Sequence, residues 1–180
     1  TQSRSSAASD VYKRQPFEAL EGVLGATSGY MGGTMENPTY EDVVTGETGH
    51  AEVVEILYDP NIVTYDELLE VFWRNIDPTA LNYQFADVGS QYRTEIFTVG
   101  ENQMQAAETS KKELGDSGKF DKPIVTAISA APKFYIAEEY HQDFYKKQAM
   151  RYEMYAKASG RKGYIEAVSY THLTLPTIYS

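Results

Sequence analysis

The sequence contains no cysteine among its 180 residues. This absence excludes disulfide bonds, thiolate metal sites and a thiol nucleophile anywhere in the chain. Chemistry that needs a cysteine is therefore closed to the protein in its present form.

Positive charge is also scarce, with 16 Lys and Arg against 26 Asp and Glu and a formal net charge of -10. A surface that binds nucleic acid or an anionic membrane needs clustered Lys and Arg, so neither partner is expected. The sequence also lacks an apolar run long enough to span a bilayer. With 42% hydrophobic residues, we expect one soluble domain, cytoplasmic and monomeric, with a sizeable core.

Both ends of the chain differ in composition from the middle. Residues 1–15 are rich in Ser, Ala and Arg and have no apolar segment of a secretory signal, and residues 169–180 lack Asp, Glu, Lys and Arg. Both ends resemble translated adaptor sequence, and we predict that they are non-native tails; natural disordered tails are the alternative. The predicted domain therefore covers residues 16–168.

Hydrophobic periodicity predicts helices and strands that alternate through this domain. Predicted strands cover 23–30, 52–57, 95–99 and 125–136, the last bent at Pro132. Predicted helices cover 16–20, 65–76, 101–114 and 138–158, with a capping box from Thr64 to Glu67 and with Gly115 ending the third. This order favours the α+β fold class, with helices packed on a mixed or antiparallel sheet.

Glu52 begins the second predicted strand, directly after the glycine-marked turn Gly49-His50-Ala51. If its side chain enters the core, the carboxyl must be paired or protonated, and a carboxyl that is protonated at neutral pH is a proton donor. If it lies on the polar side of an edge strand, it is an ordinary solvent-facing residue, because strand residues alternate faces. Spacing alone leaves both interpretations open.

Tyr40 and Tyr92 lie in predicted loops and not on periodic stripes. Tyr40 follows the rigid turn Asn37-Pro38-Thr39, and Tyr92 shares the long loop 81–93 with Asp87. Loops of this length often carry function. A structural role, with apolar area buried and the hydroxyl bonded, is the alternative for each tyrosine.

The histidines do not form a metal-binding pattern. His50, His141 and His172 have no companion at a ligand spacing. We therefore expect structural or solvent-bonded histidines and no metal.

Six separated motifs follow one another along the chain: Gly29-Tyr30-Met31-Gly32-Gly33, Asn37-Pro38-Thr39-Tyr40, Gly49-His50-Ala51-Glu52, Tyr58-Asp59-Pro60, Asp87-Val88-Gly89-Ser90-Gln91-Tyr92-Arg93 and Ala137-Glu138-Glu139-Tyr140-His141-Gln142. Their order and spacing resemble the A-type peptide methionine sulfoxide reductases over about residues 16–168. Several motifs in register are far more specific than any one of them. The resemblance implies that family's fold, a ferredoxin-like core in a two-layer sandwich of helices on a mixed or antiparallel sheet.

The resemblance also implies a reaction. In that family a cysteine thiolate attacks the sulfur of methionine S-sulfoxide, free or in proteins, while the oxygen is protonated and leaves as water. A second thiol and then thioredoxin reduce the resulting sulfenic acid, and no cofactor is bound. By position, Glu52 is the proton donor, aided by the hydroxyls of Tyr40 and Tyr92, with Asp87 in a supporting role. A Glu in an apolar pocket has a raised pKa, as proton donation requires.

The chain departs from the family at the nucleophile. The family's Gly-Cys-Phe-Trp motif precedes the first helix, and counting back from Pro16 puts its cysteine near Ser9. The flanking Ala8 and Asp10 do not match the motif, and serine is a far poorer nucleophile than a thiolate at neutral pH. The Phe and Trp that would hold the substrate methyl group are missing too. We therefore predict a reductase domain that is catalytically inert as it stands.

Two explanations of the missing motif remain. The chain is a chimeric or truncated copy of an active reductase, or it is a natural nucleophile-free relative that binds oxidised methionine or a protein partner. Loss of the strand that carries the motif would leave an edge or a gap in the sheet. The sequence leaves open whether the tail residues replace that strand.

Overall fold

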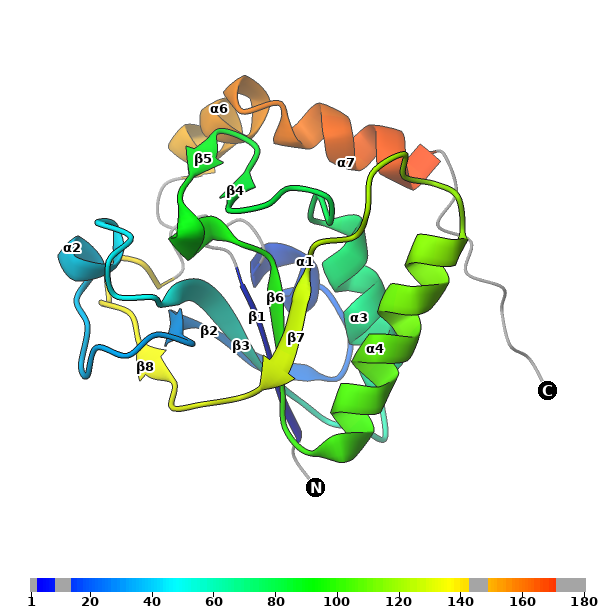
Figure 1. The fold of residues 1–180 in the computed structure, drawn as a ribbon, viewed down its shortest axis with the longest axis horizontal. Coiled ribbons are helices and arrows are strands. Elements are labelled where there is room, and N and C mark those ends of the chain that lie inside the picture. Colours follow the sequence, from blue (N-terminus) through cyan, green and yellow to red (C-terminus); the bar gives the residue numbers. More distant parts are fainter. Residues whose placement is uncertain (1–2, 9–13, 143–148, 171–180) are drawn as a thin grey trace.

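The computed structural model describes residues 3–8, 14–142 and 149–170. In chain order its elements are β1 (Ser3–Ala8), α1 (Arg14–Glu18), β2 (Val23–Met31), α2 (Tyr40–Val43), β3 (Ala51–Tyr58), α3 (Tyr65–Arg74), β4 (Tyr83–Gln84), β5 (Asp87–Val88), the 3-10 helix η1 (Ser90–Tyr92), β6 (Glu95–Thr98), α4 (Glu101–Asp116), β7 (Ala127–Ala130), β8 (Tyr135–Ile136), α6 (Ala149–Ala158) and α7 (Arg161–Tyr170). Figure 1 shows α3 and α4 to one side of the strands and α6 and α7 across one end.

Six of the strands form one sheet in the order β7-β6-β1-β3-β2-β8. Its neighbouring pairs are antiparallel except β6 and β7, which are parallel. β4 and β5 form a separate antiparallel hairpin. The prediction of helices with a mixed sheet is thus confirmed, while the two-layer sandwich and the ferredoxin-like core stay predictions.

β1 lies inside the sheet, between β3 and β6. It pairs with β3 from Ser3 opposite Tyr58 to Ala8 opposite Val53. The composition of residues 1–15 predicts a tail outside the fold, and the structure differs at residues 3–8. A sheet ladder is made by backbone N–H and C=O groups, which every residue except proline supplies in full. Residues 3–8 therefore occupy the place in the sheet that loss of the motif-bearing strand would have left open.

The segment predicted as one strand over 125–136 forms two strands at opposite edges of the sheet. β7 pairs with β6 at one edge, and β8 pairs with β2 at the other. Pro132 lies between them; proline cannot donate to a ladder and restricts the residue before it. The chain therefore crosses one face of the sheet here, where Ala131 and Phe134 pack on the buried residues Met31, Ala51, Val53 and Phe97.

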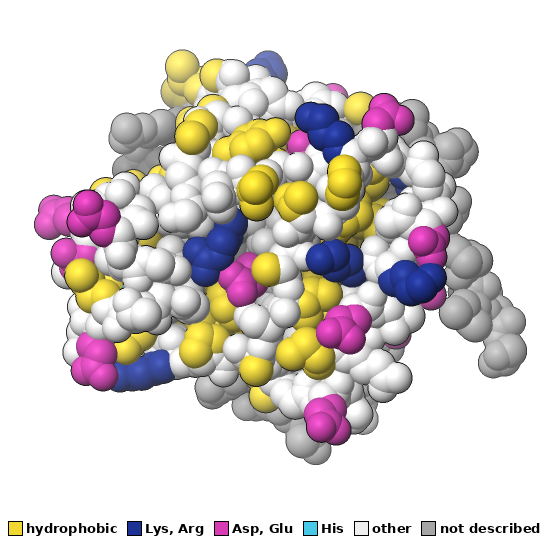
Figure 2. Space-filling model, in the orientation of Figure 1, with side chains coloured by type: hydrophobic (Ala, Val, Ile, Leu, Met, Phe, Trp, Pro, Cys, Tyr) yellow, Lys and Arg dark blue, Asp and Glu magenta, His cyan; other side chains and the backbone are white. Residues whose placement is uncertain are grey.

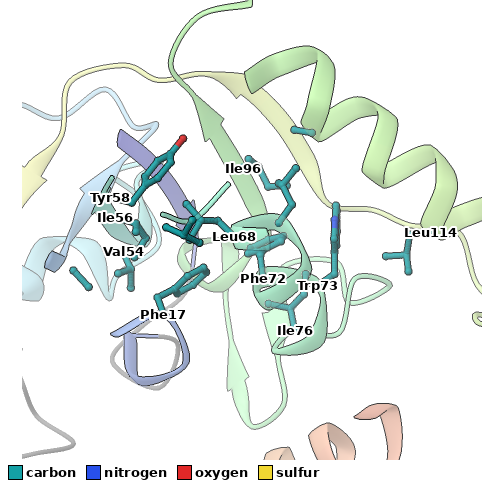
Figure 3. Packing of buried hydrophobic residues seen from close by; sticks show 14 residues of the cluster. Phe17, Val54, Ile56, Tyr58, Leu68, Phe72, Trp73, Ile76, Ile96 and Leu114 are labelled. Atoms are coloured by element: carbon teal, nitrogen blue, oxygen red, sulfur yellow. The ribbon is translucent and has the colours of Figure 1, made fainter. Parts of the chain in front are cut away.

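The main hydrophobic core lies between the other face of the sheet and helices α1, α3 and α4. Along β3 the contributing residues alternate, as the two faces of a strand require: Val54, Ile56 and Tyr58. The helices contribute Phe17, Leu68, Leu69, Phe72, Trp73, Ala107 and Leu114. Figure 3 shows the packing of this cluster, with side chains of β3 such as Val54 and Ile56 near those of the helices, such as Phe17 and Leu68. Each large buried side chain contributes about 1.5–3 kcal/mol.

α3 forms as the sequence predicts. The Thr64 hydroxyl accepts a hydrogen bond from the Glu67 N–H at 3.2 Å, and the Glu67 carboxylate accepts one from the Thr64 N–H at 2.7 Å. This reciprocal pair is the predicted capping box. Leu68, Leu69 and Phe72 of α3 are buried, as is Ile76 just beyond its end.

Two helix predictions need correction. α4 does not end at Gly115 but runs through it to Asp116, because one glycine in a helix costs only about 1 kcal/mol. Residues 138–142 of the helix predicted over 138–158 form turns and an irregular segment, residues 143–148 lie outside the described residues, and α6 begins at Ala149. α7 was not predicted; Gly160, with φ of 75°, separates it from α6.

The surface carries few clustered positive charges on the side in view in Figure 2. On the described part of that face, Lys and Arg side chains lie apart from one another among Asp, Glu and apolar groups. A phosphate-binding surface would require them to cluster. Within the described ranges, each helix is too short or too polar to cross a bilayer.

Candidate functional site

A small recess lies where β2, β3, the start of α2 and the segment after β8 meet. Its lining residues are Ser28, Gly29, Tyr30, Tyr40, Glu52, Val53, Ala137 and His141, and it is called the Glu52 recess below. Its volume is about 10 Å³, close to the space that one water molecule requires. A recess of this size accommodates one small group of a ligand, such as a single oxygen atom.

Glu52 is buried at the start of β3, with 7% of its surface exposed. β3 lies between β1 and β2 inside the sheet, so the interpretation of Glu52 as a solvent-facing residue on an edge strand is wrong. Because strand residues alternate faces, Glu52 lies on the face of Val54 and Ile56, which enter the main core. A carboxyl buried in this way is stable only if it is hydrogen-bonded, paired or protonated.

Tyr30 lies opposite Glu52 in the ladder of β2 and β3. Directly opposed residues of an antiparallel pair point to the same face of the sheet. The Tyr30 side chain is buried, and its hydroxyl donates a hydrogen bond to Oε2 of Glu138 at 2.8 Å. Burial, followed by the hydrogen bond to Glu138 and the negative charges of Glu138 and Glu52, raises the pKa of Tyr30. The hydroxyl therefore keeps its proton.

Glu138 connects two walls of the recess. Its Oε1 accepts a hydrogen bond from the backbone N–H of Tyr40 at 2.7 Å, while Oε2 accepts the one from Tyr30. Burial acts to raise the pKa of Glu138, but the hydrogen bonds from Tyr40 and Tyr30 outweigh it and the pKa is lowered. The carboxylate is therefore ionised and joins β2 to the first residue of α2.

Tyr40 reaches the recess through the turn that precedes it. Asn37 has a φ of 49°, and Thr39 caps α2 by accepting a hydrogen bond from the Asp42 N–H. The Tyr40 ring packs against the His141 ring with 4.3 Å between centroids. The sequence thus correctly predicts a turn before Tyr40, but Tyr40 itself begins α2 and does not lie in a loop. The structure brings it into the lining of the recess with Glu52.

His141 is a further residue of the recess. It lines the recess, and this is the structural one of the two roles, structural or solvent-bonded, that the sequence leaves open. Burial lowers the pKa of the imidazole, against an opposing attraction to Glu138. The ring is therefore neutral at neutral pH, and it contributes an aromatic wall beside Tyr40.

Tyr92 and Asp87 are not among the described residues that line the recess. Tyr92 ends η1, which packs against β3, the strand of Glu52. Asp87 lies in β5 and accepts a hydrogen bond from the hydroxyl of Tyr155 in α6. Of the predicted site residues, Glu52 and Tyr40 therefore share the recess, while Asp87 and Tyr92 lie on the neighbouring loop.

The connection from β1 to α1 starts next to Glu52. Ala8, the last residue of β1, is opposite Val53 in the ladder. Ser9, the position counted for the family's cysteine, lies outside the described residues. The last residue of β1 is therefore paired with the residue that follows Glu52.

His50 has the structural role that the sequence predicts. It is 1% exposed, its Nδ1 accepts a hydrogen bond from the Gly33 N–H at 3.0 Å, and its Nε2 lies 2.7 Å from the Met35 carbonyl oxygen. These bonds fix the turn after β2. His172 lies outside the described residues, and within the part of the chain that is described, three His, Asp or Glu side chains nowhere gather as metal ligands.

The sequence signal for Tyr30 and Glu138 was present but incomplete. Both residues lie in motifs quoted for the resemblance, Tyr30 in the first and Glu138 in the last. Their connection depends on the register of β2 against β3 and on the approach of the segment after β8. Neither can be read from the sequence, because the pair is 108 residues apart.

Comparisons with known sequences agree with one another. The family described as "PMSR: Peptide methionine sulfoxide reductase" matches residues 13–172. The "Peptide methionine sulfoxide reductase MsrA" of Bacillus licheniformis is 50% identical over 152 residues, covering 84% of this chain and 84% of the relative. The protein of the same name from Listeria innocua is 51% identical over 153 residues, covering 85% of this chain and 86% of that relative.

Solved structures show the same similarity. "Methionine sulfoxide reductase A of Corynebacterium diphtheriae" is 33% identical with a TM-score of 0.73, covering 83% of this chain and 76% of that one. Mxr1 from Saccharomyces cerevisiae in reduced form is 28% identical with a TM-score of 0.76, covering 83% and 87%. The yeast protein in complex with Trx2 is 22% identical with a TM-score of 0.54, covering 79% and 84%, and shows similarity of fold.

Proposed function

The chain belongs to the peptide methionine sulfoxide reductase family, and on this premise we propose that the Glu52 recess receives the oxygen of a methionine S-sulfoxide, free or in a protein. Relatives at about 50% identity carry the name MsrA, the A type. The volume of the recess, about 10 Å³, suits one oxygen atom. The rest of the substrate would lie outside it.

The observation that carries the proposal is a buried carboxyl at this recess, with a tyrosine from α2 in the same lining. Attack on the sulfoxide sulfur drives negative charge onto the oxygen, so proton donors must already point to where it develops. Glu52 supplies the proton in this scheme. The hydroxyls of Tyr40 and Tyr92 assist, and Asp87 supports them from the loop beside β3.

The covalent step of the family needs a thiolate that this chain lacks. In that step the cysteine attacks sulfur and the S–O bond breaks; overall, the sulfoxide loses its oxygen to become methionine while the thiol becomes a sulfenic acid. A second thiol and then thioredoxin reduce the sulfenic acid, with no bound cofactor. We therefore propose that the chain binds the sulfoxide as a monomer without reducing it.

Binding without reduction is a function of its own if the missing motif is natural. The position of β1 supports this possibility, because residues 3–8 complete the sheet that carries Glu52. Because the sheet is complete, the recess can keep its shape without the cysteine motif. The competing explanation, a chimeric copy of an active reductase, makes the same prediction for binding and differs only in the source gene.

Calorimetric titration tests the proposal on the full chain. The probes are the S and R sulfoxides of N-acetylmethionine methylamide, which imitate the residue within a protein. We expect heat of binding with S, a weaker response with R, and loss of the S signal in Glu52→Ala. Glu47→Ala, at an exposed glutamate in the loop before β3, is the matched control. Equal binding of the two epimers, or none, would contradict the proposal.

A further inference from the structure

We propose that Glu138 is a positioning residue of the Glu52 recess, which sets Tyr40 and Tyr30 for a sulfoxide oxygen beside Glu52. The proposal rests on the function proposed above, because it assigns a further residue to the same site. Glu138 is not itself among the residues that line the recess. It acts through the two tyrosines that do.

The first argument is the number of acceptors that Glu138 supplies. Tyr30 and Tyr40 lie on separate elements, and each donates to a different carboxylate oxygen, at 2.8 Å and 2.7 Å. An ionised carboxylate has two acceptor oxygens and forms shorter, stronger hydrogen bonds than a neutral group. An amide of the same shape has one acceptor oxygen. Glutamine can therefore keep only one of the two bonds in their present direction.

The second argument follows the single proton of Tyr30. A tyrosine hydroxyl has one proton to donate, and here it goes to Glu138. Toward Glu52, its neighbour across the ladder, Tyr30 can offer only lone pairs. Lone pairs suit a protonated carboxyl and disfavour a carboxylate. Glu138 thus arranges the site for a Glu52 that donates its proton.

The third argument is that Glu138 is itself fixed. The Gln142 amide accepts from the Ser28 N–H at 3.1 Å and donates to the Ser28 carbonyl at 2.9 Å, so the end of the segment is bonded to β2. At its start, β8 pairs with Gly29 and Tyr30. A Cβ on Gly29 would lie 2.4 Å from the Tyr135 carbonyl oxygen, which shows how closely the segment approaches β2.

The segment also holds the Tyr40 ring. Tyr140 meets it edge-on with 6.5 Å between centroids, and His141 packs on it at 4.3 Å. Backbone and ring of Tyr40 are thus held by neighbouring residues of one segment. Loss of the hydrogen bond to Glu138 would free the backbone N–H of Tyr40, while the contacts of its ring would remain. We therefore expect Tyr40 to shift in position and the rest of the fold to stay intact.

The test is calorimetric titration of the full chain with the same S and R sulfoxides. Glu138→Gln should weaken binding of S by about tenfold, the range of one charge-assisted hydrogen bond, and leave R unchanged. A merely structural role would weaken both epimers alike, so the ratio of the two affinities separates the roles. Glu139→Gln, its exposed neighbour, is the control and should match the parent chain.

Tyr30→Phe provides a second variant. It removes the hydroxyl without removing Glu138, and it should also lower the affinity for S more than for R. Because both changes break the same bond, the double variant should lose less than the sum of the single losses. An unchanged S affinity in Glu138→Gln, or in Tyr30→Phe if the first variant does not fold, would overturn the positioning role. No binding of S by the parent chain would overturn the proposed function and this proposal together.

Discussion

Tyr30 and Glu52 face each other across β2 and β3, and both are buried at the same recess. The Tyr30 hydroxyl donates its proton to Glu138. The oxygen that lies across the strands from the Glu52 carboxyl can therefore only accept a hydrogen bond. The relationship is set by the register of two interior strands, not by a loop. Groups on strands are held more accurately than groups on loops, which suits the role of proton donor proposed for Glu52.

The role of Glu52 can be measured once a nucleophile is supplied. With Gly-Cys-Phe-Trp restored before α1, Glu52→Ala should lower turnover of the S sulfoxide by about 10²-fold, because a general acid contributes on that order. Turnover is measured as formation of methionine with dithiothreitol as the reductant, because the restored chain has one cysteine and no second thiol to pass electrons from thioredoxin. Glu47→Ala in the same background should keep full activity, and a restored protein indifferent to Glu52→Ala would show that the acid lies elsewhere.

The turn after β2 should tolerate no side chain at Gly33. A Cβ there would lie 2.4 Å from the backbone N of His50 and from the carbonyl oxygen of Thr48, and backbone cannot yield as a flexible side chain can. Gly33→Ala should lower the free energy of unfolding by about 2 kcal/mol, measured by urea denaturation. Gly25→Ala in β2, with nothing within 4 Å of the added Cβ, should be nearly neutral; equal losses at both positions would contradict the explanation.

The capping box of α3 should contribute measurably to stability. Thr64→Ala removes the acceptor of the Glu67 N–H and should cost about 1 kcal/mol. The exposed Thr109 lies inside α4 and bonds back to the Gln105 carbonyl. Thr109→Ala should be neutral or slightly stabilising, because alanine is the better helix former. The free energy of unfolding of both variants is measured by chemical denaturation. A larger loss of stability in Thr109→Ala than in Thr64→Ala would refute this account.

Glu67 should give that contribution a pH dependence. The hydrogen bonds from the Thr64 N–H and hydroxyl lower the pKa of Glu67 in the folded protein. A carboxyl with a lowered folded pKa stabilises the fold fully above its ordinary pKa, and this stabilisation is lost as the pH falls through the folded value. Glu67→Gln should therefore be less stable than the parent at ~pH 7, and the difference should shrink as the pH falls below the ordinary carboxyl pKa and through the lower folded value. A stability difference between Glu67→Gln and the parent that grows as the pH falls would contradict the lowered pKa of Glu67.

Local signals in the sequence were sufficient for the longer central elements β2, β3, α3 and α4. The alternation around Val54 and the capping box at Thr64 predict β3 and α3, since burial and capping act over a few residues. The contribution of residues 3–8 to the sheet could not be predicted, because ladder bonds come from the backbone and leave little trace in composition. The same holds for the separation of β7 from β8, which depends on which distant edge each strand meets.

In the candidate site too, some residues could be predicted from the sequence and others could not. Glu52 and Tyr40 stand out in the sequence because a carboxyl opens an apolar strand and a tyrosine follows a rigid turn. Tyr30 looks like an ordinary strand residue, and Glu138 like a polar residue of a helix. Their hydrogen bond spans 108 residues, so only the three-dimensional arrangement could associate them with the recess.

The most direct measurement of the central claim is turnover before and after the cysteine motif is restored. Reduction with dithiothreitol as the electron donor is followed with the S and R sulfoxides for the chain as it stands and for the chain with Gly-Cys-Phe-Trp placed before α1. We predict no turnover by the first and reduction of S, not R, by the second. Reduction by the cysteine-free chain, or an inert restored chain that still binds S, would contradict the claim that this recess is a reductase site that lacks its Gly-Cys-Phe-Trp motif.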